Sequence, residues 1–220
     1  MFNHCPPKEI PNLISVTQPD GKRYYTLPNG NRVPSVTTVV GAKKKQSIME
    51  WRKRVGDQEA NRISKVATTR GNRVHLLAER YLKNEPINWL KEMPDAVGMF
   101  RSMIKPIQNI NNINYQEQAL WSEKLNMAGR VDLIAEWDGV LSVIDFKTSS
   151  KVKAKEDIID YFAQECAYAI MMEELTDIPV HQLVTLMAVD GMQEPLVFIE
   201  KTEDHINSLL EYIDFYRKNS

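Results

Sequence analysis

The most regular pattern in the chain is a pair of apolar runs, 128–137 and 140–147, on either side of the dipeptide Asp138-Gly139. This dipeptide is favoured in two-residue hairpin turns because both of its residues tolerate positive φ angles. The pattern therefore predicts two antiparallel strands in which Trp137 pairs with Val140. Both faces of these strands carry apolar residues, as in a strand at the centre of a sheet: Val131, Leu133 and Ala135 on one face, Ile134 and Val143 on the other.

Three charged residues interrupt these apolar runs. In the predicted register Asp132 lies directly opposite Asp145, with Cβ atoms about 5 Å apart, and Lys147 shares a face with Asp145. Facing carboxylates destabilise a sheet, and burying them is costly unless another group compensates. A Mg²⁺ or Mn²⁺ ion would compensate, because hard cations bind carboxylates together with water and substrate phosphates. A surface hairpin with solvated charges is the alternative, and it fits the two apolar faces poorly.

An Asp, an Asp-x-Lys strand and a bound cation are together what hydrolysis of a phosphodiester requires. The cation polarises the phosphoryl oxygen and lowers the pKa of a bound water. The Lys147 ammonium would steer that water or offset charge that develops in the transition state. The hairpin therefore predicts a metal-dependent phosphodiesterase site.

The remaining periodicities surround this hairpin with helices and further strands. Helices are expected at 47–55, 57–83, 94–109, 156–175 and 203–217, and strands at 113–122, 181–189 and 195–200. Residues 1–22 are expected to be an irregular lead-in to a hairpin of 24–27 and 32–36, in which Pro34 restricts the second strand to an edge. No linker divides the chain, so we predict a single α/β domain over 1–220, with a mixed sheet sandwiched by helices.

Glu117 is a candidate third acid of the site. If strand 113–122 folds back onto the next strand around Lys124 to Met127, Ala119 faces Asp132, and Glu117 lies on the same face one pair further along. The other interpretation of Glu117 is a solvated surface residue.

His75 lies within the long helical pattern and is a candidate metal ligand. A helical histidine is more often a rim or core residue than a ligand. It becomes a ligand candidate only beside Asp132 and Asp145, where a neutral imidazole nitrogen would complete the coordination of the cation. A His75/Glu79 metal pair one helical turn apart, serving an unrelated hydrolase, is the minor alternative.

Gln164 and Tyr168 form a polar notch in an otherwise apolar helix. They are four residues apart and therefore share one face of that helix. One interpretation is a structural hydrogen bond, and the other is that both side chains face Lys147 and a nucleic acid.

Composition narrows the class of protein. The chain is 43% hydrophobic and 26% charged, which is ordinary for a globular protein, and no apolar run approaches the ~20 residues of a membrane span. Cys5 and Cys166 are too few for a disulfide framework or an iron–sulfur cluster. No phosphate-binding loop motif is present, so no ATP is expected. We expect an intracellular protein, in the cytoplasm of a bacterial or phage-infected host, without membrane contact.

Positive charge is concentrated in residues 43–73, which carry ten Lys and Arg against three acidic residues in a chain of net charge −1. This segment is either a phosphate-tracking surface or a solvated helix face. The candidates for contact with DNA are Lys43, Lys44, Lys45, Arg52, Arg70, Arg73 and Thr148.

Taken together, these residues resemble the PD-(D/E)XK nuclease superfamily, in particular its RecB-like branch. The leader, from Tyr24-Tyr25 to Thr37-Thr38, is similar to that of the small exonucleases related to phage proteins and the mitochondrial genome maintenance exonuclease. The resemblance covers roughly 24–170. Five motifs occur in the expected order: Arg70-Gly71-Asn72-Arg73-Val74-His75, Glu117, Gly129-Arg130-Val131-Asp132, Val143 to Ser149, and Gln164-x-x-x-Tyr168.

The resemblance implies a restriction-endonuclease-like sheet and a role for each motif residue. His75, Asp132 and Asp145 would bind Mg²⁺ or Mn²⁺, assisted by the Phe146 carbonyl. Lys147 would be the catalytic lysine, while Gln164 and Tyr168 would support the active site and the substrate. Glu117 matches an acidic position whose role varies within the family. Two departures are the missing iron–sulfur cysteines and the missing helicase domain.

The resulting hypothesis is a Mg²⁺- or Mn²⁺-dependent deoxyribonuclease in DNA replication, recombination or repair, with proteins of those processes as further partners. An exonuclease mode and a preference for single-stranded ends rest on the resemblance alone. The alternatives are an endonuclease on the same fold and a non-catalytic DNA-binding module. Loss of Lys147 or of a metal-binding carboxylate would indicate the non-catalytic module, and the sequence retains Lys147, Asp132 and Asp145.

Overall fold

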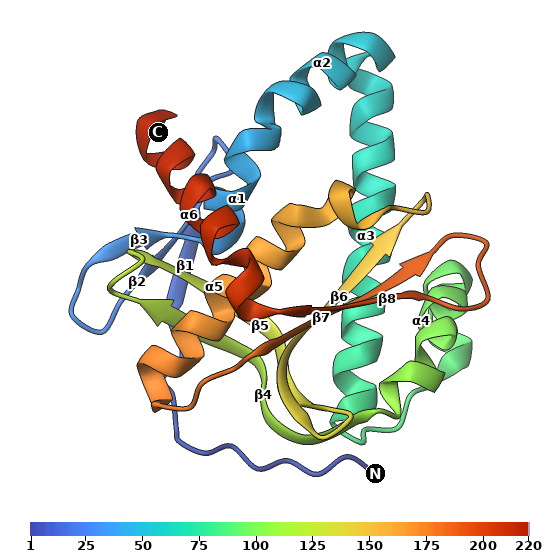
Figure 1. The fold of residues 1–220 in the computed structure, drawn as a ribbon. Helices are drawn as coiled ribbons and strands as arrows, with labels where there is room; N and C mark the ends of the chain where they lie inside the picture. The colour runs from blue at the N-terminus through green and yellow to red at the C-terminus, as the bar shows by residue number, and fades with distance from the viewer. Residues whose placement is uncertain (220) are drawn as a thin grey trace.

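A five-stranded sheet in the order β4-β5-β6-β7-β8 forms the centre of the molecule in the computed structural model, which describes residues 1–219 (Figure 1). Neighbouring strands are antiparallel except β6 and β7, which are parallel and are joined through helix α5, since parallel strands need a crossover connection. The strands are β4 (Ile110–Ser122), β5 (Met127–Trp137), β6 (Val140–Ser149), β7 (Gln182–Val189) and β8 (Leu196–Lys201).

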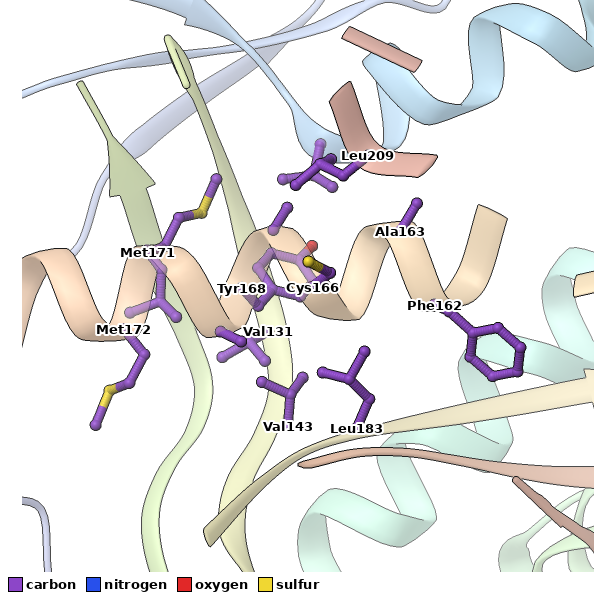
Figure 2. Close-up of a cluster of buried hydrophobic side chains, with 14 of the residues drawn as sticks. Val131, Val143, Phe162, Ala163, Cys166, Tyr168, Met171, Met172, Leu183 and Leu209 are labelled. Carbon is purple, nitrogen blue, oxygen red and sulfur yellow. The ribbon is translucent and has the colours of Figure 1, made fainter. Parts of the chain in front are cut away.

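Helices cover both faces of this sheet, as the sequence predicts. One hydrophobic cluster joins the sheet to α5 and α6, and Figure 2 shows Phe162, Met171 and Leu209 of these helices beside Val143 and Leu183 of the strands. A second cluster joins the opposite face to α3 and α4. The helices are α1 (Val36–Gly41), α2 (Lys45–Val55), α3 (Asp57–Leu82), α4 (Pro94–Ile107), α5 (Ile159–Thr176) and α6 (Thr202–Asn219), with short 3₁₀ turns η1 (Ala42–Lys44), η2 (Trp89–Lys91) and η3 (Lys155–Ile158).

The predicted hairpin between β5 and β6 is confirmed. Asp138 and Gly139 have φ angles of 50° and 80°, so both occupy the left-handed region that this turn requires. The ladder runs in the predicted register from Trp137–Val140 to Leu133–Ile144.

The alternation of side chains along β5 breaks at Asp132. Val131 packs into the cluster with α5, whereas Leu133 packs into the cluster with α3, although the sequence pattern predicted one shared face. The ladder with β6 also ends at Leu133, one residue short of Asp132. The prediction that Asp132 and Asp145 face each other as a cross-strand pair is therefore wrong, because the break turns Asp132 towards a different neighbour.

The predicted register between β4 and β5 is wrong by two residues. The turn lies at 123–126 rather than at 124–127, with Asn126 at a φ of 56°, and Ser122 pairs with Met127. The Ser122 hydroxyl accepts a hydrogen bond from the Leu125 backbone N–H at 2.9 Å, which stabilises the turn at this position. The shift places Glu117 opposite Asp132.

The lead-in is more ordered than the sequence suggested. Strand β1 (Ile14–Thr17) pairs with β2 (Arg23–Thr26), which pairs with β3 (Arg32–Pro34) in a separate three-stranded sheet. The alternating sequence Ile-Ser-Val-Thr suits a short edge strand, and the adjacent hairpin supplies its partner. The assignment of the strand with Pro34 to an edge is confirmed.

Helix α2 and the first half of α3 extend away from the sheet (Figure 1). Helix α2 buries none of its residues. Ile63 and Val66 of α3, predicted to join its apolar stripe, are 38% and 51% exposed, whereas Val74 and Leu77 are fully buried. Only the second half of α3 therefore packs on the sheet. Among the described residues, no helix has the length and apolar character needed to cross a membrane.

Candidate active site

The candidate site lies where the β5–β6 ladder ends. Oδ2 of Asp132 accepts a hydrogen bond from the backbone N–H of Phe146 at 3.0 Å, replacing a ladder bond. The same oxygen lies 3.2 Å from Nδ1 of His75, which α3 brings onto this face of the sheet. Helix α3 and strand β5 thus bring two predicted ligands together.

Glu117 completes a cluster of three donors. The ligand atoms of His75, Glu117 and Asp132 all lie within 4.8 Å of one another. One imidazole nitrogen and two carboxylate oxygens form a donor set that fits a hard divalent cation. The structure therefore favours the interpretation of Glu117 as a third acid of the site over that of a solvated surface residue.

An unusual backbone conformation aims Glu117 at this cluster. Its φ angle is 49°, in the left-handed region that a non-glycine residue rarely adopts and that costs on the order of 1–3 kcal/mol. The Arg130 guanidinium donates a hydrogen bond to the Glu117 carbonyl and another to Oδ1 of Asn12 at 2.8 Å. Arg130 thus holds the conformation that Glu117 needs.

The charges of the three donors are strongly coupled. Burial disfavours the charged imidazole, but the neighbouring Asp132 carboxylate outweighs it and raises the pKa of His75 to about 9. Burial and the negative charge of Asp132 raise the pKa of Glu117 to about 7. Burial also works against ionised Asp132, but His75 holds the pKa of Asp132 below its usual value. A cation at this cluster would displace protons from His75 and Glu117.

Asp145 and Lys147 form the second part of the site. Asp145 is only 2% exposed, its Oδ2 is in ionic contact with the Lys147 ammonium, and its Oδ1 accepts a hydrogen bond from Nε2 of Gln164 at 3.0 Å. The prediction that Lys147 and Asp145 share a face is confirmed by this contact. Gln164 therefore contacts the site through its hydrogen bond to Asp145, and its contact with a nucleic acid stays a prediction.

Burial and the nearby Asp132 charge raise the pKa of Asp145 to about 6. Asp132 and Asp145 thus still interact through space, although each has its own partners. Burial disfavours the Lys147 ammonium, but the carboxylates of Asp145 and Asp132 outweigh it and raise the pKa of Lys147 above its usual value. Lys147 therefore remains protonated at neutral pH.

Tyr168 lies under the site and against the backbone of β5. Its side chain is 2% exposed, and burial together with the Asp132 and Asp145 charges raises the pKa of its hydroxyl well above the usual value. A Cβ at Gly129 would lie 2.8 Å from the Tyr168 ring and hydroxyl. This close approach explains the glycine of the Gly-Arg-Val-Asp motif.

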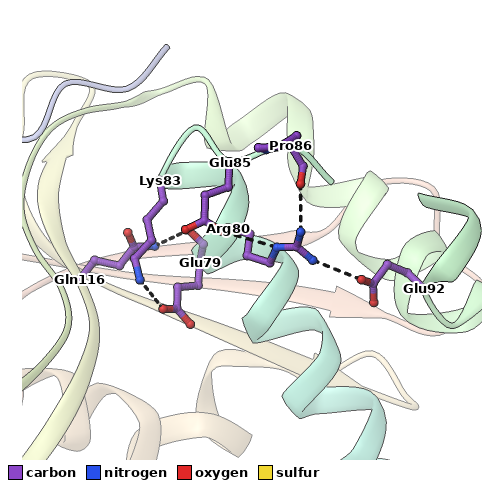
Figure 3. A network of polar contacts seen from close by, with 7 residues as sticks. All are labelled: Glu79, Arg80, Lys83, Glu85, Pro86, Glu92 and Gln116. Atoms are coloured by element: carbon purple, nitrogen blue, oxygen red, sulfur yellow. Dashed lines mark hydrogen bonds and ion pairs between the residues drawn. The ribbon is translucent and has the colours of Figure 1, made fainter. Parts of the chain in front are cut away.

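The Glu79 carboxylate forms an ion pair with Lys83 and is not part of the donor cluster. Figure 3 shows its carboxylate facing Lys83, at 2.6 Å, while its backbone carbonyl accepts a hydrogen bond from Nε2 of Gln116 at 3.0 Å. The structure groups His75 with Glu117 and Asp132 rather than with Glu79. The alternative of a His75/Glu79 metal pair thus finds no support in this geometry.

Most of the basic candidates for DNA contact have acidic partners. Lys45 is exposed, and Thr148 lies beside Gly71 of α3. The ion pairs of the others are Lys43–Glu211 (3.5 Å), Lys44–Asp160 (2.6 Å), Arg52–Asp57 (2.7 Å), Arg70–Asp190 (3.2 Å) and Arg73–Glu92 (3.9 Å). The net positive field of the basic segment is therefore weaker than its composition indicates.

Sequence reasoning missed two residues beside the site. Glu165 is fully buried on α5, and burial, reinforced by the Asp145 charge, raises its pKa well above the usual value. Tyr161 lies against Lys147, with the ammonium 5.1 Å from the ring centroid. Tyr161 precedes Gln164 by three residues on the same helix, a spacing that places both side chains on one face and could have identified it.

Residues 49–213 match the PD-(D/E)XK nuclease superfamily. This match covers most of the chain and agrees with the mixed sheet, its flanking helices and the Asp-x-Lys strand, so the chain belongs to this superfamily. The sheet and its flanking helices are therefore those of a nuclease superfamily fold.

A human relative, mitochondrial genome maintenance exonuclease 1, is 31% identical over 134 residues, which is 56% of this chain and 38% of the human protein. The chain thus matches well under two thirds of the length of that relative.

Proposed function

We propose that the protein is a Mg²⁺- or Mn²⁺-dependent deoxyribonuclease that acts as an exonuclease on single-stranded DNA ends during replication, recombination or repair. The observation that carries the proposal is the cluster of His75, Glu117 and Asp132 donors beside the Asp145–Lys147 pair. Members of this family typically use divalent cations, and a hard cation suits this donor set.

His75, Glu117 and Asp132 would hold the cation, with Asp145 and the Phe146 carbonyl completing the protein ligands. When bound, the cation would supply Lewis acidity and a more acidic water. Lys147 remains an ammonium group, so its role is to orient the nucleophile and offset charge on the phosphate rather than to accept a proton.

Gln164 and Tyr168 support this arrangement from α5. The Gln164 amide fixes one oxygen of Asp145, so that the other oxygen faces Lys147 and would be the one that binds the cation. Tyr168 stays protonated and fills the space under β5, where it excludes water from the buried side of the site.

The exonuclease mode is supported by the name of the human relative, which describes that protein and not this chain. The preference for single strands is supported by the basic segment of residues 43–73. In this segment Lys45, the first residue of α2, is exposed. Single-stranded DNA is flexible enough to follow such an irregular basic surface.

The test is cleavage of end-labelled linear DNA, single- and double-stranded, with Mg²⁺, with Mn²⁺ and with EDTA. Wild type and Lys105→Ala should cleave only with a cation. Lys105 lies on α4, pairs with the exposed Glu194 and serves as the matched charge control. Lys147→Ala should lose at least a hundredfold in rate. Equal cleavage by Lys147→Ala and wild type would refute the proposal.

Circular substrates separate the exonuclease from an endonuclease on the same fold. An exonuclease leaves circular single- and double-stranded DNA intact, whereas an endonuclease cleaves at least one of the two. A non-catalytic DNA-binding module would bind linear DNA but cleave none of these substrates at any cation concentration.

A further inference from the structure

Tyr161 gathers three lysines around one aromatic ring. The ammonium nitrogens of Lys44, Lys147 and Lys153 lie 5.2, 5.1 and 5.0 Å from the centroid of the Tyr161 ring. Lys153 also donates a hydrogen bond to the Tyr161 hydroxyl at 2.9 Å. The three lysines come from η1, β6 and the loop after β6, so only the tertiary fold brings them together.

The positive charge of this cluster is incompletely neutralised. Lys44 pairs with Asp160 at 2.6 Å, and Lys147 pairs with Asp145. Lys153 has no carboxylate within ion-pair distance in the part of the chain that the structure describes. Since each nitrogen lies about 5 Å from the same point, any two are within about 10 Å, where salt screens their repulsion only partly.

Such a cluster is costly to maintain without an anion. Cation–π contacts to this partly buried ring offset only part of that repulsion. A phosphate group would instead accept hydrogen bonds from the ammonium groups and the Tyr161 hydroxyl, and so convert repulsion into attraction. Because Lys147 is itself part of the cluster, a phosphate bound there would lie directly beside Lys147.

We propose that Tyr161, Lys44 and Lys153 form a phosphate-binding subsite for the nucleotide next to the bond that is cleaved. The subsite rests on the proposed nuclease function, because Lys147 would border both the scissile phosphate and this second phosphate. Its ligand is one phosphate group of the DNA strand, either an internal phosphodiester or a terminal 5′-phosphate. Tyr161 and Lys153 act in binding and positioning the strand, and not in the chemical step.

The primary test is binding of a fluorescently labelled 12-nucleotide single strand in EDTA, where no cleavage occurs. Lys153→Ala should weaken binding about fivefold at 0.1 M salt and lower the slope of log affinity against log salt by about 0.7, the value for one lost phosphate contact on a single strand. Lys105→Ala, on the opposite face of the sheet, removes the same charge and should change neither.

Two further variants separate binding from folding. Lys153→Arg keeps the charge and should restore wild-type affinity and slope. Tyr161→Phe keeps the ring that the lysines contact but removes the hydroxyl, and should weaken binding about threefold with the melting temperature unchanged. In steady-state cleavage with Mg²⁺, both Lys153→Ala and Tyr161→Phe should raise KM and change kcat less than twofold.

Oligonucleotides with a 5′-phosphate and with a 5′-hydroxyl distinguish the two sources of the phosphate. A loss in Lys153→Ala confined to the phosphorylated strand identifies a terminal phosphate, and an equal loss on both strands identifies an internal phosphodiester. Wild-type affinity and slope in Lys153→Ala on both strands, with wild-type cleavage intact, would overturn the subsite alone. Absence of cleavage by wild type under all conditions would instead overturn the proposed function.

Discussion

Gly129 and Tyr168 approach so closely that a single methyl group at position 129 would lie 2.8 Å from the carbon and oxygen atoms of the tyrosine ring edge. Gly129 lies three residues before Asp132 on β5, and Tyr168 lies four residues after Gln164 on α5. Their contact therefore fixes the distance between the strand with the first acid and the helix that supports the second.

Gly129→Ala should displace Tyr168 and disturb the site, because the ring is buried and has no free space to retreat into. We expect a loss of roughly 1–3 kcal/mol in the free energy of unfolding and at least a tenfold loss of cleavage. Urea unfolding and cleavage assays measure both. Gly98→Ala is the control, since Gly98 lies in α4 with open space around it, and should stabilise the helix by about 0.5–1 kcal/mol.

Arg130→Ala should loosen Glu117 rather than unfold the protein. The Arg130 guanidinium holds the Glu117 carbonyl, and without it the left-handed backbone should relax to an extended conformation. We expect Mn²⁺ affinity to fall about tenfold, as measured by calorimetry. If Arg130→Ala and Glu117→Gln each weaken binding but the double variant is no weaker than Glu117→Gln, Arg130 acts through Glu117; additive losses would contradict this.

His75→Ala should weaken Mn²⁺ binding by at least tenfold, because it removes the nitrogen donor of the cluster. Glu79→Gln, one helical turn away, should leave the affinity within twofold, since the Glu79 carboxylate contacts Lys83. The paramagnetic relaxation of water protons by Mn²⁺ reports both affinities. The reverse order of effects would favour a His75/Glu79 pair instead.

The cation-free protein should lose stability as the pH rises from about 5 to about 9. Glu117, Asp145 and His75 have folded-state pKa values of about 7, about 6 and about 9, each raised above the usual value of its side chain. The folded state therefore binds these protons more tightly than the unfolded state does. The stability that this binding contributes is lost as the pH rises through each folded-state pKa. Melting temperatures in EDTA between pH 5 and pH 9 test this direction.

Mg²⁺ should reverse that loss, because it replaces the protons that leave His75 and Glu117. The increase in melting temperature caused by Mg²⁺ should therefore grow from pH 5.5 to pH 8.5. Glu117→Gln should flatten the pH dependence of the cation-free protein and reduce the effect of Mg²⁺. A constant effect of Mg²⁺ over this range would show that the cation binds elsewhere.

Features determined by local sequence were predictable. The Asp138-Gly139 turn sets the β5–β6 register by itself, because few dipeptides tolerate two successive positive φ angles. The turn at 123–126 lacks such a signal. Its left-handed residue is Asn126, a type that tolerates positive φ, but residues 123–126 contain no glycine that would fix the turn, and the predicted register was two residues off.

The details of the site depended on tertiary structure. The break in alternation at Asp132 follows from its contacts with His75 and the Phe146 N–H, which come from other elements. The left-handed conformation of Glu117 has no sequence signal, since it depends on Arg130 across the sheet. The residue types of the site were thus predictable, and the pairing of Asp132 with His75 and Glu117 rather than with Asp145 was not.

Helix α3 is one uninterrupted rod of 26 residues, about 39 Å long. Its outer half stands clear of the body with α2, and its inner half carries His75. His75 lies between Val74 and Leu77, the two buried residues that anchor this rod to the sheet. Its imidazole therefore lies at the anchored part of the helix, where any movement of the outer half displaces it least.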